Sequence, residues 1–487
     1  YLVMHTWSSL FGDSPYALRL VSALLGVAVV PLIYWAGTRM FSRRAGLIAA
    51  GLAALSPVEI HYAQEARMYG MVPVLAVAVL YTFYRLLVAP ARWAFSGFVG
   101  ALAAGLYLHY YFLFLLPLAG FALWAPQPRA AVRRAAGALL LVAAMFAPWV
   151  PIFLGQAANS SPDWIGTFWR RHEIVYAVPW SLESLGPGAR YPTWSTFKFA
   201  SSAASGVISL CLAALVLGGA ALQLYRSWQD AKDPRPSAPP SLPRRGKGGG
   251  RTRRAKTSPD PSLVDRETPS ERPMALALTL AAVLVPLLIA FTVSLLRRPV
   301  YVVARYDLIA WGAYYLLAGA VLARLRPRLA WPLIALWVAL SCYTLWPYFT
   351  TDRPKRNYAD LGQSIARTLV AKAQPGESVV FTASTRTMTQ YYLRRTPNRF
   401  RLMSYPLGTD AHLGWIDQRI RTNKTFAARE AQRFATWLVD SGTPPGVVWV
   451  VAPRSRGTAP LLAELRRRGY RPDRTRSRGV LLCLRRE

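Results

Sequence analysis

The chain has 487 residues, of which 53% are apolar types and 17% are charged, and its formal net charge is +35. Long Leu, Ala and Val runs with few charges exclude a small soluble domain and are typical of a polytopic membrane protein. The positive charge also suggests nucleic acid as a partner. However, the arginines cluster in short connectors and two polar segments without a nucleic-acid motif, so we expect no nucleic-acid binding.

Ten segments are predicted to cross the membrane, because a span needs roughly 20 apolar residues, and fewer where the helix is partly buried in protein. In chain order the predicted spans are 15–38, 45–58, 70–88, 93–108, 109–124, 136–154, 202–224, 274–296, 302–323 and 329–348. Only the stretch "LHYY" separates the fourth and fifth of them, which predicts a tight turn there.

The connectors between these spans alternate in charge. One set carries the segment 225–272 and Arg39, Arg43, Arg44, Arg85, Arg92, Arg129, Arg133, Arg134, Arg324, Arg326 and Arg328. The positive-inside rule places that set in the cytoplasm. The other set is therefore predicted to lie outside, and it comprises the loop 59–69, the turn at His109, the Trp-rich segment 155–200, the connector 297–305 and everything after 350.

Composition divides the chain further. Residues 1–224 and 273–349 are predicted to form two parts of one α-helical transmembrane domain. Residues 225–272 are rich in Pro, Gly, Ser and Arg and have no apolar period, which predicts a disordered basic cytoplasmic linker that contacts anionic lipid.

Residues 350–487 have a different character, because helical and strand patterns alternate there. Helices are predicted at 361–373, 427–442 and 459–470, and strands at 378–383, 446–453 and 479–485. This alternation predicts an extracytoplasmic α/β domain. The domain has no GxGxxG loop, so we expect no nucleotide and a supporting or acceptor-guiding role.

Few polar side chains are predicted at membrane depth on the outer side. They are Asp13, Arg19, His61, Gln64, Glu65, Arg67, Tyr69, His109, Tyr110, Arg297, Arg298, Arg305, Tyr306 and Asp307. Because all fall on one side by topology, we expect them to converge on one cavity. The spacing of His61 and His109 does not suggest a metal site, and the three cysteines have no zinc spacing, so no metal or cofactor is predicted.

Arg67 and Arg305 suit an anionic headgroup, because guanidinium groups bind phosphate bidentately and keep their charge. An acidic residue beside them, such as Glu65, suits general-base work on an alcohol. Structural alternatives stay open: Glu65 and Arg67 as a local ion pair, Arg19 as an anchor for a helix end, and Arg305 snorkelling to the headgroups. The residues alone therefore predict a polar, lipid-facing cavity of undecided chemistry.

Two stretches carry a resemblance to a known family. "LFGDSPYALRLVSALLGVAVVPLIY", followed by "AGLIAAGLAALSPVEIHYAQEARMYGM", resembles the bacterial relatives of protein O-mannosyltransferases. These are C-type integral-membrane glycosyltransferases, which include the lipid A aminoarabinose transferases. The resemblance covers residues 1–125 well and extends through topology and "VVARYDLIAWGAYYLLAG" to about residue 348.

The resemblance implies a polyprenyl-phosphate sugar as donor, inversion at the anomeric carbon, and transfer to an acceptor hydroxyl of a protein, lipid or glycan. It also implies catalysis on the outer face of the cytoplasmic membrane. Arg67 and Tyr69 match the family's "ARxY"-like motif, and Arg305 and Tyr306 match an "RY" pair that lies near the lipid phosphate in relatives. The supporting residues that we expect are Glu65, His61, His109 and Arg19.

One departure from the family concerns the catalytic base. In relatives this acidic residue lies in the first outer loop, after a first transmembrane helix, and both would precede Tyr1 here. We therefore expect an N-terminally truncated chain that holds the donor site, lacks the base and is inactive alone.

Two alternatives from other classes stay open. One is a non-catalytic lipid-binding or transport protein, although a transporter would more often show inverted repeats, and the sequence has no internal repeat. The other is an envelope scaffold whose outer α/β domain binds a partner.

Overall fold

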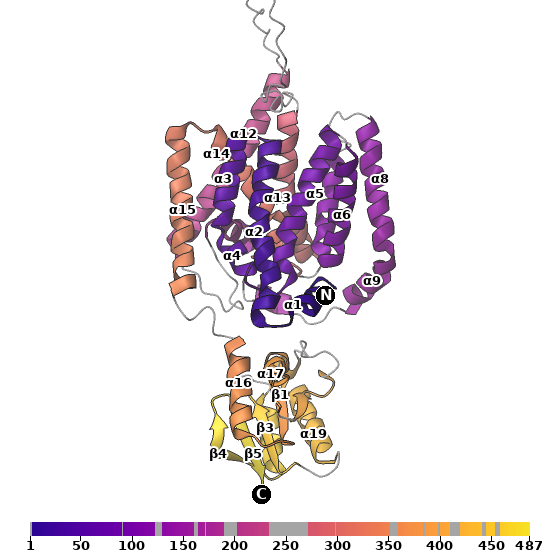
Figure 1. Cartoon of the computed structure of the whole chain (residues 1–487), viewed down its shortest axis with the longest axis vertical. Coiled ribbons are helices and arrows are strands. Elements are labelled where there is room, and N and C mark those ends of the chain that lie inside the picture. The colour runs from indigo at the N-terminus through magenta and orange to yellow at the C-terminus, as the bar shows by residue number, and fades with distance from the viewer. Residues whose placement is uncertain are drawn as a thin grey trace, which may run out of the picture. The chain divides into compact units, whose positions relative to one another are not determined.

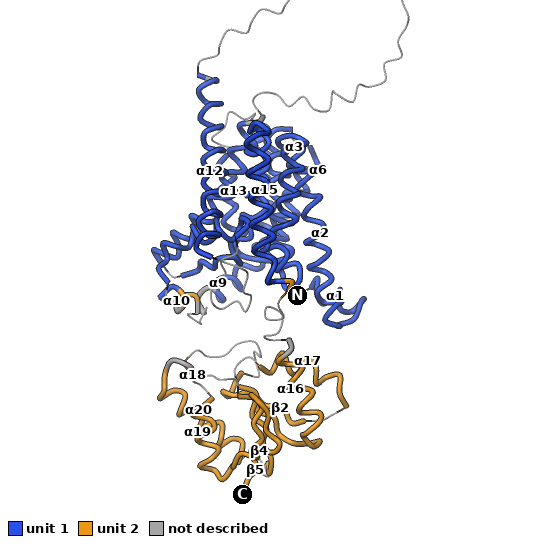
Figure 2. Tube along the Cα trace, turned by 90° about the vertical axis from the view of Figure 1, so that its left-hand side faces the viewer, with its two compact units in different colours: residues 1–159, 169–195, 199–348 blue, residues 160–168, 196–198, 349–487 orange. Residues whose placement is uncertain are grey.

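The computed structural model describes most of the chain, in a series of ranges. These are residues 2–89, 91–121, 129–159, 164–170, 172–188, 202–232, 271–297, 299–350, 359–382, 385–397, 400–409, 419–440, 445–452 and 458–487. Most of the predicted linker, much of the Trp-rich segment and Arg298 lie outside them. The chain forms two compact units, residues 1–159, 169–195 and 199–348 in the first, and residues 160–168, 196–198 and 349–487 in the second (Figure 2).

The first unit is a helical bundle (Figure 1). Its main helices are α1 (Leu2–Phe11), α2 (Pro15–Met40), α3 (Arg43–Ala54), α4 (Pro57–Tyr62), α5 (Met71–Val88), α6 (Arg92–Leu108), η2 (Tyr110–Gly120), α8 (Arg129–Phe146), α9 (Val150–Asn159), α11 (Ala177–Leu185), α12 (Ala203–Lys232), α13 (Glu271–Leu296), α14 (Trp311–Arg324) and α15 (Pro327–Thr350). Two 3-10 turns, η1 (Met68–Gly70) and η6 (Asp307–Ala310), lead into α5 and α14.

Six stretches of the described chain are long and apolar enough to cross a membrane. They are Pro15–Met40, Met68–Val88, Arg129–Gln156, Ala203–Asp230, Pro273–Leu296 and Pro327–Thr350. Each coincides with a predicted span. The other four predicted spans correspond to shorter helices: α3 has 12 residues, α6 has 17, η2 has 11 and α14 has 14.

Two of the shorter helices differ from the prediction for local reasons. The predicted span 45–58 stops early because α3 ends at Ala54, and Ser56 then caps a new helix that starts with Pro57. The predicted span 302–323 begins late, because the Asp307 carboxylate accepts the backbone N–H groups of the turn before it. In Figure 1 the connector from α14 to α15 lies at the end of the bundle opposite α1 and α9.

Two glycines let α2 and α3 approach closely, as small residues do between membrane helices. A Cβ added at Gly46 would lie 2.5 Å from the carbonyl oxygen of Tyr34, and one at Gly37 would lie 2.9 Å from Gly46 Cα. In contrast, a Cβ at Gly51, on the same helix α3, would meet nothing within 4 Å.

We therefore expect Gly46→Ala to lower the free energy of unfolding by about 1–3 kcal/mol through overpacking. The matched change Gly51→Ala should leave it equal or raise it by about 1 kcal/mol, because alanine favours the helix. Thermal unfolding of the two variants in detergent measures the difference. Equal midpoints would show that α2 and α3 do not pack as described.

The second unit is built on a five-stranded sheet of order β2-β1-β3-β5-β4. Its strands are β1 (Ser378–Thr382), β2 (Arg401–Tyr405), β3 (Val447–Val451), β4 (Tyr470–Arg478) and β5 (Leu481–Arg486). Strands β1, β2 and β3 are parallel, whereas β5 pairs antiparallel with both β3 and β4. The sheet confirms the predicted α/β character.

Helices cover both faces of this sheet. One apolar core joins α16 (Ala359–Lys372) and α17 (Thr385–Leu393) to the sheet, and another joins α19 (Lys424–Asp440) and α20 (Thr458–Arg467) to its other face. Within the described residues, the predicted helices at 361–373, 427–442 and 459–470 correspond to α16, α19 and α20, and the predicted strands at 378–383, 446–453 and 479–485 correspond to β1, β3 and β5. The sequence analysis missed α17, β2 and β4, because threonine-rich and arginine-rich stretches lack the apolar periods of buried elements.

Candidate functional site

Arg305 and Tyr69 meet although 236 residues separate them in the sequence. Arg305 Nε donates a hydrogen bond of 2.6 Å to Tyr69 Oη. The guanidinium carbon lies 5.0 Å from the centre of the Tyr69 ring and 5.7 Å from that of Tyr306. Tyr69 is 2% exposed, whereas Arg305 is half-buried, so a buried hydroxyl directs a guanidinium group that still reaches the surface.

A layer of aromatic rings surrounds this contact. The ring of His109 lies 6.2 Å from that of Tyr69 and 4.8 Å from that of Tyr306. The ring of Tyr111 lies 4.9 Å from that of Tyr306, and its hydroxyl donates a hydrogen bond to the carbonyl of Val300. The predicted turn at His109 thus joins the same site as the connector between α13 and α14.

The backbone at Arg305 forms a tight turn. Ala304 has a φ of 56°, a left-handed conformation that non-glycine residues adopt rarely. The Asp307 carboxylate accepts the N–H groups of Ala304 at 3.0 Å and Arg305 at 2.8 Å. Tyr62 Oη donates a 2.6 Å hydrogen bond to the carbonyl of Ala304.

Glu65 lies within the electrostatic reach of three arginines. Burial raises the pKa of the Glu65 carboxyl, and the guanidinium groups of Arg67, Arg305 and Arg19 act against that rise. No ion pair joins Glu65 to Arg67 among the residues that the structure describes. The structural alternative of a local Glu65–Arg67 pair is therefore not what the side chains form.

His61 contacts the same acid from α4. Its Nε2 lies 3.7 Å from Glu65 Oε1, and its side chain is 3% exposed. Burial, aided by the charge of Arg67, lowers the pKa of His61 to about 3, so the ring is neutral at physiological pH. The contact is therefore not an ion pair.

The predicted residues differ in how closely they gather. Tyr69, Arg305, Tyr306, His109 and the pair His61–Glu65 occupy the described cluster. The side chains of Arg67 and Arg19 are exposed, and the Arg67 carbonyl accepts a 3.4 Å hydrogen bond from Ser22 on α2. These two arginines therefore act on Glu65 through their charge.

The sequence analysis did not assign roles to three residues of this site. Tyr62 and Asp307 hold the turn at Ala304, and Ser56 accepts a 2.9 Å hydrogen bond from Trp311 Nε1, which joins α4 to α14. Asp307 follows the "RY" pair directly, and that adjacency was the available signal. Nothing local marked Tyr62 or Ser56.

Glu59 is a further buried acid on α4. Its side chain is 3% exposed, and its carboxylate oxygens have no hydrogen-bond partner among the described residues. Burial raises its pKa to about 8 from an unfolded value near 4.5. The folded state therefore binds the proton more tightly, so this contribution to stability is present below about pH 4.5 and is lost as the pH rises towards 8.

We expect Glu59→Gln to remove this loss, because the amide cannot ionise. The drop in melting temperature between pH 5 and pH 8.5 should be smaller for Glu59→Gln than for the parent chain. The exposed Glu173→Gln serves as the matched control and should keep the parental drop. Equal drops in all three proteins would contradict the assignment.

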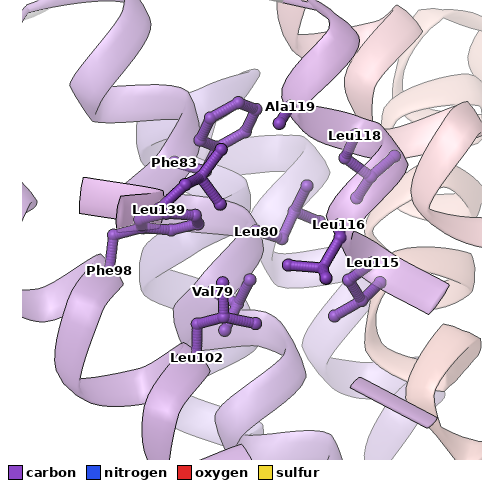
Figure 3. Close-up of a pocket in the computed structure, with 10 residues that line it drawn as sticks. All are labelled: Val79, Leu80, Phe83, Phe98, Leu102, Leu115, Leu116, Leu118, Ala119 and Leu139. Atoms are coloured by element: carbon purple, nitrogen blue, oxygen red, sulfur yellow. The ribbon is translucent and has the colours of Figure 1, made fainter. Parts of the chain in front are cut away.

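An apolar pocket lies among α5, α6, η2 and α8 (Figure 3). Its lining residues are Val79, Leu80, Phe83, Phe98, Leu102, Leu115, Leu116, Leu118, Ala119 and Leu139. Helix α5 follows Tyr69 and η2 follows His109, so two elements of the polar site continue into this pocket. Among the described residues no group of His, Cys, Asp and Glu side chains has the arrangement of a metal site.

Comparisons with known proteins bear on this site. Residues 1–152 match the family model of dolichyl-phosphate-mannose-protein mannosyltransferases, which confirms the resemblance seen in the sequence. A comparison with curated proteins found no match. The crystal structure of ArnT from Cupriavidus metallidurans bound to undecaprenyl phosphate superposes with a TM-score of 0.52 at 16% identity, over 99% of this chain and 86% of that chain.

The apo structure of the same ArnT has a TM-score of 0.42 at 14% identity, again over 99% of this chain and 86% of that chain. The likeness to the bound form shows a shared fold, that of a multi-pass helical membrane protein with a C-terminal α/β part.

Proposed function

We propose that this chain is a membrane glycosyltransferase that moves a sugar from a polyprenyl-phosphate donor to an acceptor hydroxyl. The observation that carries the proposal is the contact between Arg305 and Tyr69. It joins the two sequence motifs that the family resemblance selects, and it leaves a directed guanidinium group half-buried at the site. The family match over residues 1–152 and the shared fold with ArnT support the same function.

The roles follow from the chemistry of a phosphate leaving group. Arg305, with Arg67 nearby, stabilises the negative charge that develops on the phosphate as the sugar departs, because guanidinium groups form short, charge-assisted hydrogen bonds to phosphate oxygens. Tyr306 and His109 line the position beside it, and the Glu65 carboxyl lies within the electrostatic reach of Arg305 and Arg67. The acceptor oxygen forms a bond to the anomeric carbon as the bond from that carbon to the phosphate oxygen breaks. The hydroxyl proton passes to a general base, the lipid phosphate leaves, and the single displacement inverts the configuration.

The lipid part of the donor also needs a place. The pocket of Figure 3 is lined by apolar side chains, some of them from α5 and η2, the elements that follow Tyr69 and His109 in the chain. Within the membrane an isoprenoid chain packs against such a surface through van der Waals contact, because lipid tails are about as apolar as these side chains. We propose that part of the polyprenyl chain lies against this pocket.

Location follows from the predicted topology. We propose that the chain resides in the cytoplasmic membrane, with the Arg305 site on the outer face and the α/β domain extracytoplasmic. The distribution of arginines among the connectors supports this orientation. Membrane lipids and the polyprenyl-phosphate sugar are then its partners, together with the acceptor.

Two measurements on the purified chain test the function. Undecaprenyl phosphate should bind at least about tenfold more tightly than undecaprenol, because the site recognises the phosphate. Equal affinity would contradict a phosphate site. Release of undecaprenyl phosphate from undecaprenyl-phosphate mannose, in vesicles that contain the purified chain, would identify an enzyme and would overturn the expectation that this chain is inactive alone. Phosphate-selective binding without release agrees with that expectation, whereas a scaffold shows neither.

A further inference from the structure

We propose that Tyr62, Ala304 and Asp307 are positioning residues that set the guanidinium group of Arg305 for the phosphate. We call these residues the clamp: the Tyr62 hydroxyl binds the Ala304 carbonyl, and the Asp307 carboxylate binds the backbone N–H groups of Ala304 and Arg305. The inference rests on the proposed function, because it assigns Arg305 to phosphate binding. It adds residues that touch neither the phosphate nor the sugar.

The clamp holds a backbone conformation that alanine does not favour. Ala304 is the one described non-glycine residue with a positive φ, at 56°, and it is 1% exposed. Such a residue persists when its surroundings over-determine it, and strained residues cluster at functional sites. Here the strained residue directly precedes the arginine that the site depends on.

Asp307 closes the turn from the C-terminal side. Its two carboxylate oxygens accept the N–H groups of Ala304 and Arg305 separately, at 3.0 and 2.8 Å, and the side chain is 4% exposed. A carboxylate that accepts two backbone N–H groups fixes the direction of both peptide planes. The Cα–Cβ bond of Arg305 therefore leaves the turn in one direction.

Tyr62 closes the turn from another part of the chain. Its hydroxyl donates to the Ala304 carbonyl at 2.6 Å across 242 residues of sequence, and its side chain is 5% exposed. The short helix α4 that carries Tyr62 is itself fixed, because Ser56 at its N-cap accepts the indole N–H of Trp311 on α14. Helix α4 is therefore held at both ends: Ser56 binds Trp311 on α14, and Tyr62 binds the turn at Ala304.

Arg305 is thus held at its backbone and at its guanidinium group by two tyrosines of the short stretch 62–69. Tyr62 holds the backbone before it, and Tyr69 accepts its Nε at the other end. The rings of these two tyrosines lie 5.1 Å apart. A long arginine side chain loses considerable rotamer freedom on binding, and fixing it beforehand reduces that loss when phosphate binds.

Tyr62→Phe tests the clamp with a single-atom change. We expect the dissociation constant for undecaprenyl phosphate to rise about tenfold, because a guanidinium group of Arg305 that points in another direction binds the phosphate less well. Tyr314→Phe is the matched control. Tyr314 is fully buried, and its hydroxyl has no hydrogen-bond partner among the described residues. The affinity of Tyr314→Phe for undecaprenyl phosphate should therefore equal that of the parent chain.

A rescue variant separates positioning from general stability. Glycine adopts a positive φ without strain, so Tyr62→Phe combined with Ala304→Gly should regain most of the lost affinity. A role in stability alone would lower the melting temperature and leave the affinity of the folded protein unchanged. If Tyr62→Phe does not fold, Asp307→Asn takes its place, because the amide accepts one of the two backbone N–H groups and should weaken binding similarly.

The outcomes also separate this inference from the proposed function. If Arg305→Ala loses undecaprenyl phosphate while Tyr62→Phe and Asp307→Asn bind it as the parent does, the clamp is wrong and the phosphate site stands. If Arg305→Ala itself binds normally, the phosphate site fails and the clamp fails with it. Weaker binding by Tyr62→Phe with recovery by Ala304→Gly supports both.

Discussion

Arg305→Ala should weaken the binding of undecaprenyl phosphate by about 30-fold or more. Truncating one partner of a buried, hydrogen-bonded charge pair costs about 2–5 kcal/mol, and each 1.4 kcal/mol is roughly a factor of ten in affinity. The change also leaves the buried Tyr69 hydroxyl without the Nε donor that now lies 2.6 Å away. Titration of the detergent-solubilised chain with undecaprenyl phosphate measures the effect.

Two further variants sharpen this result. Arg305→Lys keeps the positive charge but loses the planar fork, so we expect an affinity between those of the parent and Arg305→Ala. Arg328→Ala removes an exposed arginine at the start of α15 and should bind like the parent. If Arg328→Ala and Arg305→Ala were equally weakened, the loss would reflect overall charge and the specific site would be refuted.

Trp449→Ala should have the largest effect on the stability of the α/β domain. Trp449 lies on β3, within the sheet, and its side chain is fully buried. Its indole N–H donates a 2.6 Å hydrogen bond to Glu377, which also pairs with Arg476 at 2.9 Å. Removing a buried Trp side chain costs about 3–5 kcal/mol, because a cavity remains and the contacts are lost.

Hydrogen exchange of the full chain provides the measurement, because it reports the opening of β1 and β3 separately from that of the helical unit. Trp437→Ala is the matched control: it removes the same side chain from the same domain at a position that is 38% exposed on α19. Its cost should be nearer about 1 kcal/mol. Similar protection losses in both variants would show that Trp449 does not occupy the core of the sheet.

The sequence predicted the apolar helices and the core strands well, for a local physical reason. Pro273–Leu296 is a long apolar run and Val447–Val451 a short one, and each can be recognised from its own residues without knowing what packs against it. The early end of α3 and the late start of α14 depend on hydrogen bonds that the side chains of Ser56 and Asp307 accept from the backbone. Hydropathy does not contain those bonds, so the predicted spans there were too long.

The site illustrates the same division. Local motifs alone selected Arg67, Tyr69, Arg305 and Tyr306, because the family resemblance resides in short stretches. Only the packing of α4, η1 and the turn before α14 brought Tyr69 to Arg305 and Tyr62 to Ala304, across more than 200 residues. The electrostatic surroundings of Glu65 likewise depend on arginines from three separate segments. The amino-acid order therefore determined which elements and which charged groups the protein has, whereas the tertiary structure decided which of them meet, because hydrogen bonds between distant segments depend on how the helices pack.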